Sequence, residues 1–363
     1  MAQEFDPKII ETAWDALIVN MQTSGKLVSE HAVDAQELAE GYRFLTRTVG
    51  GALDTLMEKN DPEHPVFTRA LTPYRKYFGD NPDTYYDRLA LDPSLTYKIS
   101  GNRGSIPYLG FTIYGGGTRN LTIVSHLMAP EMVFSSNGDF EVYLSATRPK
   151  GAKNWLELDN SSRLMIVRQY FFDPLKKGAA TYCAEVVGDV PVPAAAEPGQ
   201  IAKKIKMVGR FLTFVTSKTV EFCGELEQKP NQLSVDSRNG ESVLSFFPTH
   251  DNDYFIGWYD LKKDEALVVE GVPPECLYWS LTLYNRWFES YEYLHHQVHL
   301  NSEQITLNKD GSYRLVVSAT EPENQNWLDT QGHDVGMLAF RWLGGGGVAS
   351  QPTMRVVKMN DLN

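Results

Sequence analysis

The stretch from Asn326 to His333 holds an unusually dense set of side chains that could do chemistry. It reads Asn-Trp-Leu-Asp-Thr-Gln-Gly-His, so Asp329 and His333 are four residues apart with Gly332 between them. A turn at the glycine would bring the carboxylate to the imidazole, where it fixes the tautomer and raises the basicity of the ring. Asp334 is an alternative partner for the same histidine. The spacing therefore predicts an acid–base pair.

A cation follows this stretch on the next predicted strand, Gly336–Trp342. Arg341 offers a planar guanidinium for a substrate carboxylate or a developing oxyanion. No Ser or Cys stands in a Gly-x-Ser-x-Gly context, so we do not expect a covalent triad. The alternative is a structural loop in which Asp329 and Thr330 bond their own backbone and Trp327 fills the core.

The stretch has a partial twin earlier in the chain. Residues 138–149 and 311–322 share Gly, Ser-Ala-Thr and Pro at an offset of 173, and each segment leads to Asn-Trp-Leu. One β-unit is therefore used twice. Because the first copy has Asn154 and Trp155 without the other groups, the repeat assigns Asn326 and Trp327 to the scaffold. Asp329, Thr330 and His333 remain as candidates special to the second copy.

A second dense stretch, Tyr278–Ser290, predicts a strand that emerges from the core. Its inward face would run through Trp279, Leu281 and Leu283, and then change to polar groups. Such a change is typical of a pocket wall. The alternative is that the tryptophans are core and Glu289 is solvated. The candidate binding residues are Asn285, Trp287, Glu289, Tyr291, Tyr293, Thr330 and Arg103.

Two other groups of residues could form sites. His295, His296 and His299 lie close together, but nothing nearby is helical and the glutamate of a His-Glu-x-x-His motif is absent, so we predict no metal and no cofactor. A loop rich in Tyr and Asn, 76–86, precedes Arg103 and could cover a pocket or simply pack as a turn.

The elements that must position these residues predict an α+β fold. We expect an N-terminal helical region at 1–93, a first β-unit at 94–188, a linker and long helix at 189–230, and a second β-unit with a C-terminal tail at 231–363. Apolar residues recur every four positions from Phe5 to Met21, and Gly25 is expected to end that helix. Tyr291–His299 is expected to be a strand. Short strands without helical alternation indicate antiparallel sheets, and no phosphate-loop motif is present.

Composition narrows the class of protein. The 363 residues carry a formal net charge of −12, which disfavours a nucleic acid or an anionic membrane surface as partner. We see no secretory signal and no apolar run long enough to span a membrane. Three unpaired cysteines, Cys183, Cys223 and Cys276, fit reduced, packed thiols. These features predict a cytoplasmic location.

The second half of the chain resembles the family called domain of unknown function 1214. The resemblance is carried by Trp279, Asn285, Trp287, Ser290-Tyr291, Asn301, Gln304, Asp310-Gly311, Asn326–Thr330, Gly332-His333 and Arg341-Trp342. Gly41–Arg47, Asp80–Asp83 and Ser100–Gly104 extend it toward the N-terminus. It implies a jelly-roll-like β-sandwich in a soluble homo-oligomer, and it implies no reaction. One departure is Ala319–Glu323, where the family has His-x-Asp-Pro-Gly.

The sequence favours a cofactor-independent enzyme of the hydrolase, lyase or isomerase type that acts on a small, largely apolar or ring-containing molecule. His333 would be the general acid or base, Asp329 its orienter and Arg341 the anion-stabilising group. Trp287 with Tyr291 or Tyr293 would form the pocket wall. The alternatives are a non-catalytic β-sandwich that binds a carbohydrate or another small ligand, and a structural or assembly protein.

Overall fold

The structure, a computed structural model, describes residues 7–117, 120–173, 175, 177–237, 247, 249–323, 325–345 and 350–362. The chain divides into two compact units. Unit 1 comprises residues 1–75 and 83–217, and unit 2 comprises residues 76–82 and 218–363. The short segment Lys76–Pro82 therefore belongs to unit 2, although the chain on both sides of it belongs to unit 1.

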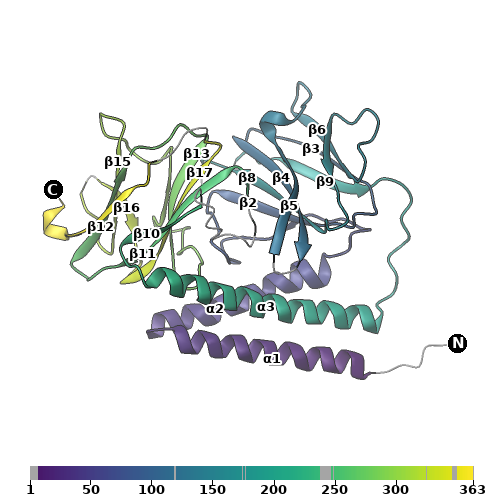
Figure 1. Ribbon diagram of the computed structural model, residues 1–363, viewed down its shortest axis with the longest axis horizontal. Helices are drawn as coiled ribbons and strands as arrows, with labels where there is room; N and C mark the ends of the chain where they lie inside the picture. Colours follow the sequence, from purple (N-terminus) through teal and green to yellow (C-terminus); the bar gives the residue numbers. More distant parts are fainter. Residues whose placement is uncertain are drawn as a thin grey trace. The chain divides into compact units, whose positions relative to one another are not determined.

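Three long helices accompany the β structure (Figure 1). They are α1 (Lys8–His31), α2 (Ala35–Ala52, continued by the π-helical turn Leu53–Glu58) and α3 (Pro198–Glu227). In unit 1, Ala13, Leu17, Ala202, Ile205 and Val208 pack them together. No helix in the described part of the chain is long and apolar enough to cross a membrane.

The predicted end of the first helix was wrong. The helix α1 continues past Gly25 to His31, because Gly25 is buried against the ring of Tyr42 on α2 and serves that contact. The apolar stripe was only partly right, since Met21 is 45% exposed. Phe5 lies outside the described residues.

Unit 1 contains two sheets with orders β1-β2-β8-β4-β5 and β7-β6-β3-β9. The strands are β1 (Thr68–Arg69), β2 (Thr84–Ala90), β3 (Tyr97–Asn102), β4 (Tyr108–Gly117), β5 (Asn120–Met128), β6 (Asp139–Ser145), β7 (Asn154–Glu157), β8 (Leu164–Tyr170) and β9 (Thr181–Val186). All neighbours are antiparallel except β6 and β7.

Unit 2 repeats this arrangement strand by strand, with sheet orders β10-β11-β17-β13-β14 and β16-β15-β12-β18. The strands are β10 (Gln232–Asp236), β11 (Asn252–Asp260), β12 (Glu265–Gly271), β13 (Tyr278–Tyr284), β14 (His299–Asn301), β15 (Tyr313–Ser318), β16 (Asn326–Asp329), β17 (Val335–Leu343) and β18 (Thr353–Lys358). The exception to antiparallel pairing is again the matching pair, β15 with β16. The predicted α+β fold with a duplicated β-unit and a long helix between the copies is confirmed.

The duplicated Asn-Trp-Leu holds each parallel pair in place. The Asn154 amide donates to the carbonyls of Val133 and Glu141 and accepts from the Val133 N–H. The Asn326 amide makes the same three bonds, to Thr306 and Arg314. Buried backbone groups need such partners, which explains why both copies keep the motif.

Each unit buries its main core between its two sheets. In unit 2, Trp279, Leu281 and Leu283 of β13 face the core, as the alternation predicted, and Leu315 and Val317 of β15 meet them from the other sheet. Period-two alternation places the remaining β13 side chains on the opposite face of the sheet. That opposite face carries the polar residues described below.

Three local expectations were wrong. The residues 291–298 are irregular, because the Glu292 carboxylate accepts from the backbone N–H groups of Leu294 and His295 and turns the chain. The strands β1 and β2 lie within the region expected to be helical and rich in turns. Cys183 is exposed, whereas packed thiols were expected.

Candidate functional site

The acid–base pair expected from the sequence is not formed. The Asp329 carboxylate lies 2.8 Å from Nδ1 of His296 and accepts from the Gln331 N–H. The His333 ring instead places Nδ1 2.8 Å from the Thr330 carbonyl, which can only accept, so Nδ1 carries a proton. His333 is buried and stacks on Tyr291. These contacts close a turn.

The expected pocket wall is a second tight turn. The Asn285 side-chain oxygen accepts from the N–H groups of Trp287 and Glu289, at 3.0 Å and 3.2 Å. Trp287 and Glu289 are both 0% exposed. The alternative of a solvated Glu289 is therefore also wrong. A buried amide that satisfies two backbone donors has a clear structural role.

The remaining expected binding residues fall in different places. The Tyr291 hydroxyl lies 2.6 Å from that of Tyr259, and Tyr293 lies under the Lys76 ammonium. The Thr330 side chain is 1% exposed. Arg103, in unit 1, packs its guanidinium over Phe134. Within unit 2, Tyr291 and Thr330 both contact His333, through its ring and through its Nδ1.

The histidines separate as well. His295 and His296 are exposed and lie beside Glu292 and Asp329, respectively. His299 is buried in β14, with Nδ1 2.8 Å from the Thr282 hydroxyl. It is therefore His299, and not its neighbours, that joins a buried polar group.

Arg341 belongs to the same buried polar group, which we call the unit 2 cluster. Its members are Tyr254, Thr282, Tyr284, His299 and Arg341. The side chains stand on the outer face of the β10-β11-β17-β13-β14 sheet, opposite the core. Nη1 of Arg341 donates to the hydroxyls of Thr282 and Tyr284. The guanidinium also lies 5.7 Å from the centres of the Tyr254 and Tyr284 rings.

Unit 1 contains the same arrangement, the unit 1 cluster: Tyr86, Thr112, Tyr114, His126 and Arg168. Arg168 donates to the Thr112 hydroxyl at 3.3 Å and to the Tyr114 hydroxyl at 2.8 Å. Nδ1 of His126 lies 3.0 Å from the Thr112 hydroxyl. Thr112 pairs with His126 across β4 and β5, as Thr282 pairs with His299 across β13 and β14. The two clusters are copies built in the same register.

The charge of Arg168 has an unusual environment. Its side chain is 5% exposed, and among the residues that the structure describes its hydrogen bonds go only to the two hydroxyls, with no carboxylate within ion-pair distance. Burial works to lower the pKa of Arg168, and the surrounding Tyr114, Tyr170 and Tyr86 raise it by more, so the guanidinium stays charged. A buried charge without an opposite charge is costly.

In unit 2 the chain itself supplies acceptors to the cluster. Nη2 of Arg341 donates to the Gly79 carbonyl, and the Tyr284 hydroxyl donates to the Asp80 carbonyl at 3.0 Å. Burial raises the pKa of Tyr284, which keeps its hydroxyl a donor. The segment Lys76–Pro82 is held there because the Asp80 carboxylate accepts from the N–H and hydroxyl of Ser290.

Sequence reasoning missed the unit 1 cluster and His299, although a signal was present. Tyr108-Leu-Gly-Phe-Thr-Ile-Tyr114 and Tyr278-Trp-Ser-Leu-Thr-Leu-Tyr284 share three residues at an offset of 170, and Arg341 follows Arg168 by 173. The histidines repeat as well, because His299 follows His126 by 173. The expected pocket wall instead continued the other face of β13, which enters the core.

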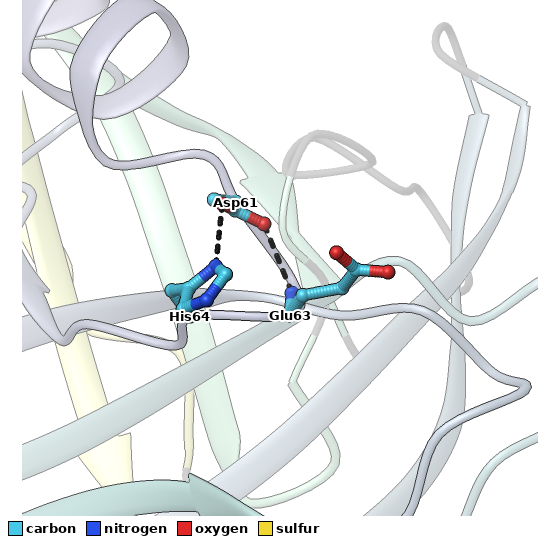
Figure 2. A group of neighbouring side chains, drawn as sticks. All are labelled: Asp61, Glu63 and His64. Carbon is cyan, nitrogen blue, oxygen red and sulfur yellow. Dashed lines mark hydrogen bonds and ion pairs between the residues drawn. The ribbon is translucent and has the colours of Figure 1, made fainter. Parts of the chain in front are cut away.

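A separate group in unit 1 has the residue types of a metal site. In the described part of the chain, Asp61, Glu63 and His64 offer one ligand atom each, and these atoms lie within 4.8 Å of one another. Figure 2 shows the His64 ring and the Glu63 backbone N–H directed at the Asp61 carboxylate. The other ring nitrogen of His64 lies 2.9 Å from the Pro191 carbonyl. Both nitrogens therefore donate, and neither has a lone pair for a metal.

The fold and the paired clusters define a duplicated β-sandwich protein in which each copy carries one buried arginine cluster. The chain belongs to the family described as "Protein of unknown function (DUF1214)", which matches residues 83–174 and 257–345. The two matched segments contain every residue of both clusters except Tyr254. The family therefore covers the duplicated part of the molecule.

Solved structures share the fold. An uncharacterised protein from Burkholderia cenocepacia is similar over 96% of this chain and 98% of its own, at 28% identity and a TM-score of 0.91. A protein from Vibrio parahaemolyticus aligns over 93% of this chain and 100% of its own, at 13% identity and a TM-score of 0.52, and shows the fold alone. A comparison with curated proteins found no match.

Proposed function

We propose that the protein binds a small organic acid and that Arg168 in the unit 1 cluster holds its acid group. The observation that supports this most directly is the buried Arg168 guanidinium, which has hydroxyl partners and no carboxylate among the described residues. Two of its five N–H groups are used by Thr112 and Tyr114. Arginine pairs readily with a carboxylate through two parallel bonds, and the Tyr86 and Tyr114 rings suit an apolar or ring-containing body.

A screen of organic acids by thermal shift tests this proposal. An acid present at 100 times its Kd should stabilise the wild type by about 2.7 kcal/mol. Arg168→Met should weaken binding by roughly 10- to 100-fold, because a hydrogen bond to a charged group contributes about 1.5–3 kcal/mol. Arg341→Lys is the matched control in the other unit and should bind as the wild type does. Equal stabilisation of the wild type and Arg168→Met would contradict the proposal.

The contact between a hydroxyl and an imidazole supports a second candidate, an enzyme that uses threonine as a nucleophile. In each cluster the threonine hydroxyl accepts from the arginine and can pass its own proton to Nδ1 of the histidine, at 3.0 Å in unit 1 and 2.8 Å in unit 2. A hydroxyl beside a base is the usual form of an activated nucleophile. We favour binding over catalysis, because the threonine–histidine contact is also present in unit 2. There the Gly79 carbonyl of the chain itself already occupies Arg341.

The catalytic candidate makes a different prediction. It requires that the protein release nitrophenol from 4-nitrophenyl acetate and that Thr112→Val abolish this release while Thr282→Val does not. If the two variants and the wild type release nitrophenol equally, the threonine is not a nucleophile. The original assignment of His333 and Asp329 as an acid–base pair has lost its geometric basis, because the two side chains bond other groups.

A further inference from the structure

The helix α1 carries a row of exposed apolar side chains. Trp14, Ile18 and Met21 follow one another at the spacing of four and three residues that places side chains on one side of a helix, and all three are exposed. Ala13 and Leu17 already serve the packing of the helices in unit 1, so the row is additional to the core side. Single exposed apolar residues are common, whereas contiguous apolar patches mark interaction surfaces.

The helix α2 extends this row. Gly25 continues it on α1, four positions after Met21, and the ring of Tyr42 on α2 lies against Gly25. Tyr42 and Leu38, one turn earlier on α2, are both exposed. The two helices run antiparallel, because only a short connection joins them (Figure 1). The row therefore crosses onto α2 and forms what we call the helix face: Trp14, Ile18, Met21, Leu38 and Tyr42.

The charges beside the row change sign along α1. Glu11 and Asp15 lie toward its N-terminal end, and Lys26 lies toward its C-terminal end. An antiparallel second copy with Ile18 opposite the partner's Met21 brings opposite charges together, since the partner's Lys26 then lies between Glu11 and Asp15. The pattern of charge on α1 is therefore complementary to itself when the helix is reversed.

The helix face has the size that a dimer needs. The 24 residues of α1 make a helix about 36 Å long and about 10 Å wide. Together with α2 beside it, the two helices offer a footprint on the order of 700 Å². A stable interface of standard size buries about 800 Å² on each partner.

A membrane surface is the other usual partner of an exposed apolar helix. Such helices carry Lys and Arg on their polar side, which anionic lipids attract. Here Glu11 and Asp15 border the row, and the chain has a net charge of −12. A second copy of the chain is therefore the better match.

We propose that the helix face is the contact between two copies of this chain, with α1 packed antiparallel on α1 of the partner across a two-fold axis. Ile18 and Met21 lie at the centre of the contact. Trp14 packs over the partner's Gly25, where no side chain excludes it. Every contact occurs twice, because a two-fold interface pairs the same surface with itself. The helix face lies outside the Arg168 cluster on the sheet, so the dimer and the binding of an acid can fail independently.

Light scattering coupled to size exclusion, over a range of concentrations of the full chain, tests the proposal. We expect the wild type to show twice the 40.9 kDa of one chain. Ile18→Glu should show the mass of one chain, because it buries two carboxylates among apolar side chains near the axis. Val19→Glu is the matched control. Val19 is 58% exposed and Ile18 40%, but Val19 points about 100° away around the helix, so this variant should stay a dimer.

An exchange of charges tests the antiparallel register. Lys26→Glu should raise the Kd of the dimer by roughly 10-fold, because it places like charges together at two symmetric positions. The double variant Asp15→Lys with Lys26→Glu should dimerise more tightly than Lys26→Glu alone. A contact of this surface with any other partner predicts no such recovery. Sedimentation velocity over a dilution series measures both Kd values.

The outcomes decide the proposal. A wild type with the mass of one chain at every concentration would overturn it, and so would a dimer that Ile18→Glu leaves intact. If the wild type is a monomer that sediments with vesicles of phosphatidylcholine and phosphatidylserine, and Ile18→Glu does not, the surface meets a membrane and the proposal is wrong. The wild-type mass needs no variant, so an Ile18→Glu protein that does not fold would not protect the proposal.

Discussion

Arg168 and Arg341 occupy equivalent positions but should contribute oppositely to stability. Replacing Arg168 by Met removes a buried charge that has no opposite charge among the described residues, which is often neutral or stabilising. Replacing Arg341 by Met removes the donor on the Gly79 carbonyl and leaves that group unsatisfied. We predict that Arg341→Met costs about 1–3 kcal/mol of unfolding free energy and that Arg168→Met costs none. Urea unfolding of both variants measures this, and an equal loss in both would mean that Arg168 is structural.

His64 should titrate above its ordinary value. The Asp61 carboxylate, through its hydrogen bond, raises the pKa of His64 from 6.5. Burial raises the pKa of Asp61, and the bonds from His64 and the Glu63 N–H outweigh this effect and lower it from 3.8. The contact therefore stabilises the fold at pH values below about 6.5 and loses its effect as the pH rises through the raised pKa of His64. It is lost again as the pH falls through the lowered pKa of Asp61.

An NMR titration of the imidazole checks this. The midpoint for His64 should lie above 6.5 in the wild type and move down in Asp61→Asn. A midpoint at or below 6.5 in the wild type would show that the contact with Asp61 does not persist in solution.

At the scale of elements, the segment Lys76–Pro82 depends on one glycine. Gly79 has a φ of +69°, and a Cβ there would lie 2.4 Å from the Phe288 ring. We predict that Gly79→Ala destabilises the protein by roughly 2–4 kcal/mol, from left-handed backbone strain and from overlap with the ring.

Hydrogen exchange would locate the effect of Gly79→Ala. The loss of protection should centre on the segment and on Ser290, whose N–H donates to Asp80. Gly311→Ala is the control: its φ is also positive, but a Cβ there meets nothing within 4 Å, so it should cost only the backbone strain. Equal losses of unfolding free energy in the two variants would mean that the Phe288 ring moves aside without cost.

Many of the strands were predictable, because the alternation of apolar and polar residues and the internal repeat both indicate them. The strand β13 follows from the alternation of Trp279, Leu281 and Leu283. The parallel pairs β6–β7 and β15–β16 were not predicted, because the strand pattern indicated antiparallel sheets. The region 291–298 failed because the Glu292 carboxylate turns a chain whose composition favours a strand. The clusters were harder to predict, since strand pairing alone brings Arg168 beside Thr112, 56 residues away in the chain.

At the scale of the whole molecule, duplication creates two clusters of which one is filled. We therefore predict one ligand per chain, although the arginine, threonine, tyrosine and histidine occur twice. The Gly79 and Asp80 carbonyls occupy the acceptor positions on Arg341 and Tyr284, so the second cluster has no place for an acid. Calorimetric titration with an acid that binds in the screen measures this stoichiometry, and a value of two would show that a ligand displaces the segment Lys76–Pro82.

The predictions of a homo-oligomer and of a cytoplasmic location remain predictions. Light scattering coupled to size exclusion tests the first: a mass near 40.9 kDa, that of one chain, would contradict it.

We propose above all that Arg168 holds the acid group of a ligand, and a crystal structure of the protein with an acid that binds in the thermal-shift screen tests this most directly. We predict electron density for the ligand carboxylate within about 3.2 Å of a terminal nitrogen of Arg168, with no ligand on Arg341. A carboxylate of the protein found on Arg168, or the acid bound only elsewhere, would contradict the account.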